Sequence, residues 1–205
     1  NMVDTYFIAL TGKQDLVAGV SLAVPVFTLM IAFGDIFGLG GSSIISRLLG
    51  EKNETAAKKA IAFCIWTSIG FGLLVTLILL LFRAPVLALL GAKGTTYQHA
   101  SDYYTWIAIG SAAIIFGLVP SNILRTEGMA AQAMIGSILG SIINIVLDPM
   151  FIFVLNQGAA GAAIATVISQ AISFLSALIY LIVKRESFGF TFSRASLKIH
   201  GPTLK

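Results

Sequence analysis

Long apolar segments separated by short polar ones are the main feature of this chain. A helix needs about 20 apolar residues to cross a bilayer. Five segments have that length and predict membrane-spanning helices at residues 16–39, 60–82, 103–124, 131–155 and 159–183. A shorter apolar stretch, residues 2–10, comes before them and is typical of the last turns of a further helix. The segments are too long for barrel strands and lack their alternation of polar and apolar residues.

The composition of the chain also indicates a helical membrane protein. The 205 residues are 57% hydrophobic and only 11% charged, with a mean hydropathy of +0.93, whereas soluble domains are about 25% charged. We therefore expect an all-α integral membrane protein, with a transmembrane helical bundle over residues 1–185 and a cytoplasmic linker over 186–205. The single cysteine, Cys64, excludes an internal disulfide and is interpreted as a small packing residue.

The basic residues set the orientation, because cytoplasmic loops of membrane proteins are enriched in Lys and Arg. With the stub at 2–10 counted as the first span, ten basic residues follow even-numbered spans and three follow odd-numbered ones. The ten are Arg47, Lys52, Lys58, Lys59, Arg125, Lys184, Arg185, Arg194, Lys198 and Lys205; the three are Lys13, Arg83 and Lys93. The loops after the even-numbered spans are therefore predicted to be cytoplasmic. These residues form no patch with interleaved aromatics, so nucleic acid is not an expected partner.

The two ends suggest a piece of a longer protein. The chain begins at Asn1 with an incomplete first helix, and its last residues lack a closing element. No basic segment before an apolar stretch marks a signal peptide. We expect further sequence at both ends.

Three acidic residues fall inside the apolar segments: Asp4, Asp35 and Asp148. Such a residue costs about 2.5–3.5 kcal/mol on insertion scales, so each suggests a functional role. Asp35 lies near the predicted inner end of its span, where reaching cytoplasmic water or capping the helix is the favoured interpretation. Asp4, Asp148 and Thr166 each lie about seven residues from the outer end of a span, so all three are expected roughly 10 Å below the outer surface.

The residues around Asp148 strengthen the case for a site. Asn144 lies four residues earlier and shares its helix face, and Thr166 and Gln170 have the same spacing on the next helix. Pro149 lacks an N–H, so the carbonyl one turn earlier loses its helical partner. These oxygens suit a proton, Na⁺ or a hydrated cation, and two nearby acids would titrate as a coupled pair. The alternative is a proline-kinked helix whose acid only satisfies a neighbouring helix.

Other motifs are weak. GLGGSS lacks the lysine and the preceding strand of a phosphate-binding loop, so its glycines are interpreted as helix-packing positions. Tyr103 and Tyr104 fit an interfacial aromatic belt as well as a substrate contact. No HExxH, GxSxG or cysteine cluster is present, and no organic cofactor is expected.

Several stretches in order resemble the multidrug and toxic compound extrusion (MATE) family: NMVDTYFIALTG, GLGGSSIISRLLGEKN, DYYTWIAIG, NILRTEGM, NIVLDPMFIF and GAAGAAIATVISQ. The resemblance covers nearly all of the chain. It implies one six-helix lobe of a twelve-helix transporter in the bacterial inner (plasma) membrane, with a second lobe as its partner. By position, the family's coupling residues fall on Asp4, Tyr103, Asn144, Asp148 and Thr166, with Pro149 as a hinge.

The function implied is export of amphipathic or cationic compounds in exchange for H⁺ or Na⁺, with Na⁺ held by Asp4, Asn144, Asp148 and Thr166. Three alternatives stay open. A lipid-linked saccharide flippase would place several basic residues in its cavity, and none lies mid-span here. An intramembrane aspartyl protease also needs two buried acids, but its YD and GxGD motifs are replaced by VDT and LDP. The third alternative is a non-transporting assembly subunit.

Overall fold

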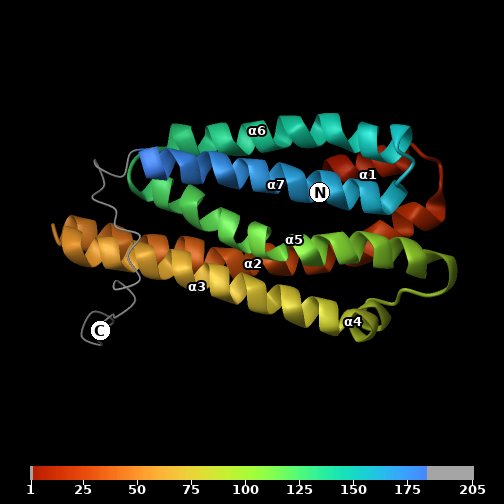
Figure 1. Ribbon diagram of the computed structural model, residues 1–205, viewed down its shortest axis with the longest axis horizontal. Coiled ribbons are helices and arrows are strands. Elements are labelled where there is room, and N and C mark those ends of the chain that lie inside the picture. Colours follow the sequence, from red (N-terminus) through yellow and green to blue (C-terminus); the bar gives the residue numbers. More distant parts are fainter. Residues whose placement is uncertain (1, 184–205) are drawn as a thin grey trace.

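The computed structural model describes residues 2–183 as a bundle of long helices (Figure 1). In chain order the elements are α1 (Met2–Ala9), α2 (Gln14–Gly50), α3 (Glu54–Leu81), α4 (Arg83–Leu89), α5 (Gly94–Thr126), α6 (Ala130–Pro149), the π-helix η1 (Met150–Val154) and α7 (Gly158–Val183). Five helical segments are long and apolar enough to span a membrane: α2, α3, α5, α6 with η1, and α7. The five predicted spans are therefore confirmed, and residues 2–183 contain no strand. The predicted linker at 186–205 lies outside the described residues.

The connections alternate between the two ends of the bundle (Figure 1). The α2–α3 and α5–α6 turns and the end of α7 lie at one end, which we call the inner end. The α1–α2 turn, the α4 region and the η1–α7 turn lie at the other, the outer end. This is the alternation on which the charge-based orientation depends, and it means that α2, α5 and α7 all run from the outer to the inner end.

The helices extend beyond the predicted spans. α2 continues to Gly50 instead of stopping at residue 39, and α5 begins at Gly94 instead of residue 103. With 37 residues, α2 is about 55 Å long, well over the roughly 30 Å of a bilayer core. Hydropathy marks only the part of a helix that lies in lipid, and polar residues continue the same helix into water. At the inner turn the Asn53 side chain caps α3 by accepting a hydrogen bond from the Ala56 N–H at 3.1 Å.

The segment after α3 was expected to be part of a loop and instead contains α4. Arg83, at the start of α4, donates a hydrogen bond to the buried Ser101 hydroxyl of α5. This contact fastens α4 against the bundle. Hydropathy alone does not detect such a short helix, because seven residues are too few to form a recognisable span.

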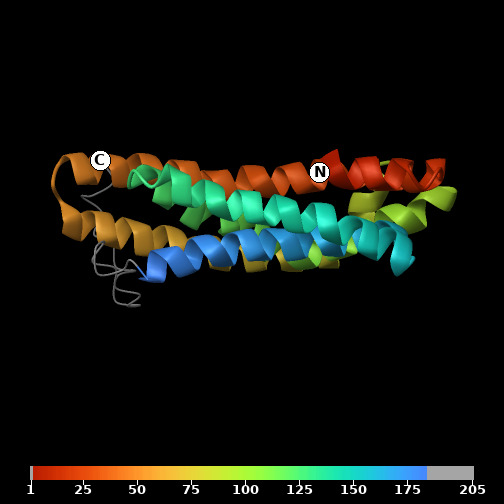
Figure 2. The same ribbon diagram turned by 90° about the horizontal axis from the view of Figure 1, so that it is seen from above.

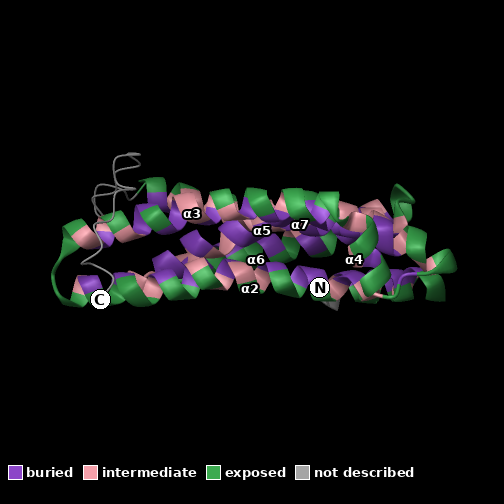
Figure 3. Ribbon diagram, turned by 90° about the horizontal axis from the view of Figure 1, so that it is seen from below, coloured by how far each residue is buried: buried purple, intermediate pink, exposed green. Residues whose placement is uncertain are grey.

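Helix α5 is the centre of the bundle. It packs against α2, α3, α6 and α7, and in Figure 3 much of its surface is coloured as buried. Viewed from above, α2 and α7 lie on opposite sides of the bundle (Figure 2).

Tyr103 and Tyr104 of α5 are 1% and 0% exposed, so the interpretation of both as an interfacial belt is wrong. Polar contacts also fasten α3 to α5: the Tyr104 hydroxyl donates to the Leu79 carbonyl at 2.8 Å, and the Thr76 and Ser111 hydroxyls are 2.6 Å apart.

Small residues allow the close approach of α2 to its neighbours. A Cβ added at Gly34 would lie 2.8 Å from the Ile115 carbonyl oxygen. One added at Gly41 would lie 2.5 Å from the Cys64 sulfur. The packing interpretation of the GLGGSS glycines is confirmed for Gly38 and Gly41 and wrong for Gly40, which faces open space. The interpretation of Cys64 as a buried packing residue is confirmed.

This packing gives a matched pair of substitutions on one helix. Gly34→Ala should destabilise the bundle by about 1–3 kcal/mol, because the backbone of α5 must move. Gly40→Ala should stabilise it by roughly 0.5–1 kcal/mol, because a Cβ at Gly40 meets no atom within 4 Å and alanine favours the helix. The protein encoded by the complete reading frame that contains this chain is purified in detergent, and the melting temperature of each variant is measured. Equal shifts for the two variants would contradict the packing argument.

Candidate functional site

The site begins at Asp4 on the short helix α1, which packs against α2, α6 and α7. The Asp4 side chain is fully buried. Thr166 of α7 donates a hydrogen bond to Asp4 Oδ2 at 2.7 Å, and the Tyr103 hydroxyl of α5 donates to the same oxygen at 3.1 Å. Tyr103 lies 99 positions after Asp4 in the sequence and Thr166 lies 162 positions after it, yet both bond to the same carboxyl oxygen. The predicted common depth of Asp4 and Thr166 is confirmed.

Asp148 supplies the second carboxyl from the last turn of α6 and is also fully buried. Asn144, one helical turn earlier, donates from Nδ2 to Asp148 Oδ1 at 3.1 Å, as their spacing predicts. Asp148 lies near enough to Asp4 for the two charges to interact, and Asn144 lies beside both carboxyls. The two acids therefore meet inside the bundle and do not face lipid.

Each carboxyl retains one oxygen without a hydrogen-bond donor: Asp4 Oδ1 and Asp148 Oδ2, both buried. Leaving a buried polar atom without a partner costs about 1–3 kcal/mol, and more when the group is charged. A proton on one acid can be donated to the other, and a monovalent cation can bind the free oxygens of both. Within residues 2–183 there is no group of three or more His, Cys, Asp or Glu side chains that could hold a metal ion. The atoms that could bind a cation at this site are oxygens, and two of the residues that supply them are acids. Ligands of this kind suit H⁺ or Na⁺.

Directly after Asp148, the helix changes form. α6 ends at Pro149 and continues as the π-helix η1, in which the Leu155 N–H donates to the Met150 carbonyl five residues earlier at 3.0 Å. The disturbance predicted at the proline thus takes the form of a widened turn, not a chain break. π-Helical turns occur frequently at functional sites. The hinge role of Pro149 stays a prediction.

A cavity of about 360 Å³, which we call the central cavity, adjoins the site. Asn144 and Thr166 line it, so two of the three residues that donate hydrogen bonds to the carboxyls also contact this space. Ser169 and Gln170 of α7 continue its polar wall toward the inner end. Thr166 and Gln170 line the same cavity, as their spacing predicts, while Ser169 was not singled out in the sequence because serine is common in membrane helices.

Asp35 does not behave as predicted. α2 continues 15 residues beyond it to Gly50, so Asp35 cannot cap a helix end, and the favoured interpretation is wrong on this point. The side chain is half-buried and lines a second cavity nearer the inner end, together with Arg125. The prediction fails because α2 does not end with the apolar segment at residue 39 but continues as a helix to Gly50.

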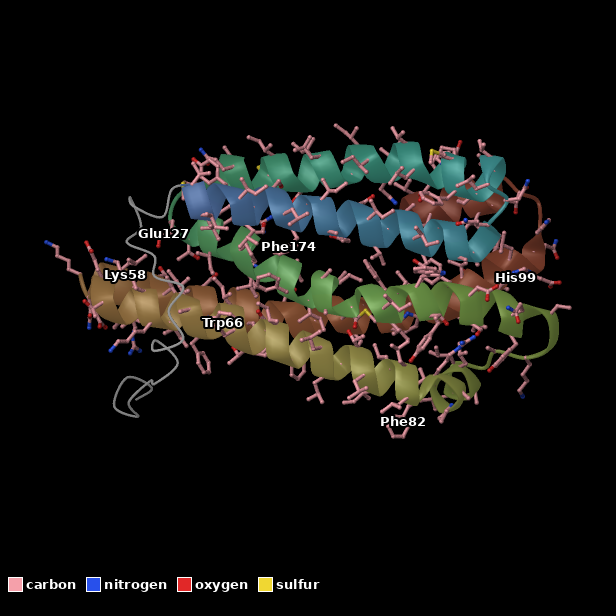
Figure 4. The ribbon with its side chains drawn as sticks, in the orientation of Figure 1. Lys58, Trp66, Phe82, His99, Glu127 and Phe174 are labelled. Carbon is pink, nitrogen blue, oxygen red and sulfur yellow. The ribbon has the colours of Figure 1, made fainter. Side chains whose placement is uncertain are left out.

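One carboxyl outside the membrane spans is perturbed. Glu127, at the α5–α6 turn, lies at the inner end of the bundle (Figure 4). Partial burial raises the pKa of this carboxyl above its ordinary value. Glu127 lines neither of the two cavities, so it takes no part in the candidate site.

Tyr103 is the site residue that the residue pattern alone did not identify. Two adjacent tyrosines near a predicted span boundary suggested an interfacial belt, and only the family resemblance chose Tyr103. The structure supports that choice, because Tyr103 contacts Asp4 while Tyr104 contacts a backbone carbonyl of α3.

Known proteins are similar to this chain in sequence and in fold. The sequence profile of the MatE family matches residues 1–150. The multidrug export protein MepA of Staphylococcus haemolyticus (strain JCSC1435) is 34% identical over 194 residues, which cover 95% of this chain and 43% of that protein.

Two solved structures match the whole chain at 32% identity. One is the inward-facing conformation of a multidrug resistance MATE family transporter of the MOP superfamily, with a TM-score of 0.91 and 46% of its length covered. The other is an outward-facing conformation of such a transporter, with a TM-score of 0.90 and 45% covered.

The chain thus spans less than half the length of the relatives that it matches. The family match covers most of the sequence, the fold match covers all of it, and the resemblance noted in the sequence is confirmed. This chain is a multi-pass protein of the bacterial plasma membrane that belongs to the MatE family and forms about half of the MATE transporter fold.

Proposed function

We propose that this chain is part of a cation-coupled antiporter, and not of an enzyme, that exports amphipathic and cationic compounds by alternating access. The observation that carries the proposal is the buried pair Asp4 and Asp148, in which each carboxyl has one oxygen without a donor. The similarity to a protein named for multidrug export supports the choice of substrates. H⁺ or Na⁺ is the coupling ion.

The cation acts by changing which arrangement of helices is most stable. When neither acid is protonated or bound to a cation, two negative charges share an apolar space, and this favours separation of α1 from α6. A proton or Na⁺ between the carboxyls removes that repulsion and favours their approach. Coupling requires the cation to bind one conformation more tightly than the other. Bending at Pro149 and η1, directly after Asp148, is the proposed response of α6.

The central cavity connects the cation to the exported compound. Asn144 and Thr166 each contact a carboxyl and also line this cavity. A substrate in the cavity therefore contacts the same two side chains that orient the acids. Competition for these residues gives a physical route by which cation binding lowers substrate affinity and releases the compound outward.

Alternating access requires a second lobe, which is the proposed partner of this bundle. The bundle superposes equally well on an inward-facing and an outward-facing transporter, with TM-scores of 0.91 and 0.90. This supports a mechanism in which the bundle keeps its overall shape and moves against the second lobe. The changes at Asp148 and Pro149 are then small adjustments that bias the position of the whole lobe.

The alternatives fit the site less well. A flippase for lipid-linked pyrophosphates would need several basic side chains in its cavity. Among the residues that line the central cavity and the second cavity nearer the inner end, only Arg125 is basic. An aspartyl protease needs water and a peptide at its acids, but Asp4 and Asp148 are both 0% exposed.

The proposal predicts that Asp148→Asn abolishes export. The product of the complete reading frame is expressed in bacteria that lack their own efflux pumps, and drug tolerance should fall to the level of cells without the protein. The matched control is Asp15→Asn, which changes an exposed carboxyl at the outer end of α2 and should leave tolerance unchanged. Full resistance in the Asp148→Asn cells, at equal protein levels, would refute the coupling role.

Purified protein in vesicles identifies the coupling ion. An imposed proton or sodium gradient should drive uptake of a fluorescent cationic dye by the unmodified protein, and Asp148→Asn should remove the response to whichever gradient is effective. If neither gradient moves the dye, cation coupling itself is wrong.

The adjacent tyrosines give a second matched pair. Tyr103→Phe removes one of two donors to Asp4, and since a hydrogen bond to a charged group contributes about 1.5–3 kcal/mol, gradient-driven uptake should fall by about tenfold or more. Tyr104→Phe removes a bond to a neutral carbonyl and should lower stability by about 0.5–1.5 kcal/mol with uptake retained. Uptake in vesicles and melting temperature are measured for both. The same loss of uptake in both variants would mean that Tyr103 is only a packing residue.

A further inference from the structure

A second cavity, which we call the inner cavity, lies between α2, α5, α6 and α7 and has a volume of about 280 Å³. Two side chains of opposite charge line it: Asp35 from α2 and Arg125 from the last turn of α5. Neither residue belongs to the carboxyl site. Arg125 is exposed, and its position at the inner end fits the distribution of basic residues, but the presence of two opposite charges in the lining of one cavity is a separate feature.

The two charges do not pair with each other. Within residues 2–183 the ion pairs are Arg47–Glu51 and Lys58–Glu54, each at 3.5 Å and each within one helix. Asp35 and Arg125 line one cavity from different helices without forming such a contact. Asp35 is half-buried within a membrane span, where an unpaired carboxylate is costly. A ligand that carries both a positive and a negative group would satisfy both residues at once.

The remaining walls suit an amphipathic molecule. Leu39, Leu118 and Phe174 provide apolar contacts, and the Phe174 ring stacks edge-on against Phe116 with centroids 4.7 Å apart. Asn122 and Ser173 add hydrogen-bonding groups near the charges. Figure 4 shows Phe174 on α7, between the inner end and the middle of the bundle. The cavity therefore presents one acidic and one basic side chain beside an apolar surface.

The inner cavity lies next to the central cavity. Leu118, Ser137, Gln170 and Ser173 line both spaces. Their volumes of about 280 and 360 Å³ together fall within the range of about 300–1,000 Å³ that is typical of small-molecule sites. A molecule in the inner cavity therefore lies next to the space that Asn144 and Thr166 share with the cation.

We propose that the inner cavity is a substrate-binding site on the cytoplasmic side that takes zwitterionic head groups, with the ammonium or other cationic group at Asp35 and the carboxylate at Arg125. The proposal deepens the export function above, on which it rests, by adding a site and a charge pattern for the substrate. Monocationic compounds would use Asp35 alone. Compounds with both charges would use both residues and gain affinity from Arg125.

The test uses two dyes that differ by one charge. Rhodamine B carries a cationic xanthylium and a carboxylate, and its ethyl ester retains the cation but lacks the anion. Binding to the purified product of the complete reading frame in lipid nanodiscs is measured by fluorescence anisotropy, with empty nanodiscs as the reference for partition into lipid. Arg125→Gln should weaken rhodamine B binding at least fivefold and change ester binding less than twofold. Asp35→Asn should weaken both, and Arg47→Gln, an exposed inner-end cation that lines neither cavity, should weaken neither.

The outcomes separate this proposal from the export function. Equal effects of Arg125→Gln on the two dyes, or no effect on either, would overturn the head-group site even if export is intact. Should Arg125→Gln reduce folding, Arg125→Lys serves instead: it keeps a cation and should preserve the preference for rhodamine B that a neutral residue loses. Selective loss of rhodamine B binding in a protein that transports neither dye would support the site and refute the export function.

Discussion

A carboxylate in the apolar interior of a membrane is stable only where its oxygens have partners. Asp4 meets this requirement through Thr166 and Tyr103, which come from two different helices. Asp148 meets it through Asn144 on its own helix. The position of α1 beside α7 and α5 therefore depends on the hydrogen-bonding needs of one carboxyl group. These contacts leave one oxygen of each acid without a hydrogen-bond donor, and this is the feature on which the proposed cation coupling rests.

The framework that holds these groups is a central helix with small contact residues. α5 contacts the four other long helical segments, and backbones approach closely at positions such as Gly34 and Gly140. Close backbone packing fixes the helices along their lengths, so side chains separated by many residues can be held at hydrogen-bonding distance. Polar residues then gather on the α6 and α7 sides of α5, where the central and inner cavities lie.

Much of this arrangement was accessible from the sequence. The lengths of the apolar segments predicted the spans. Counting residues from their outer ends placed Asp4, Asp148 and Thr166 at one depth, because each residue of a helix adds the same rise. The four-residue spacing predicted the Asn144–Asp148 contact for the same reason. Hydropathy could not predict where α2 ends, since a helix continues in water without changing its geometry, and the role of Asp35 was misjudged in consequence. The π-helix and the presence of Asp35 and Arg125 in the lining of one cavity depend on tertiary packing, which no local pattern encodes.

The separation in sequence between Asp4 and its partners also has a consequence for biosynthesis. Thr166 is made 162 residues after Asp4, which at about 5–20 residues per second is a delay on the order of ten to thirty seconds. During that time α1 holds an acid that lacks at least one of its two hydrogen-bond partners, since Tyr103 is made 99 residues after Asp4 and Thr166 is made 162 residues after it. The nascent chain must therefore keep α1 in the insertion machinery, at the lipid surface or protonated until α7 emerges, and α1 is expected to settle after the other described helices although it is synthesised before them.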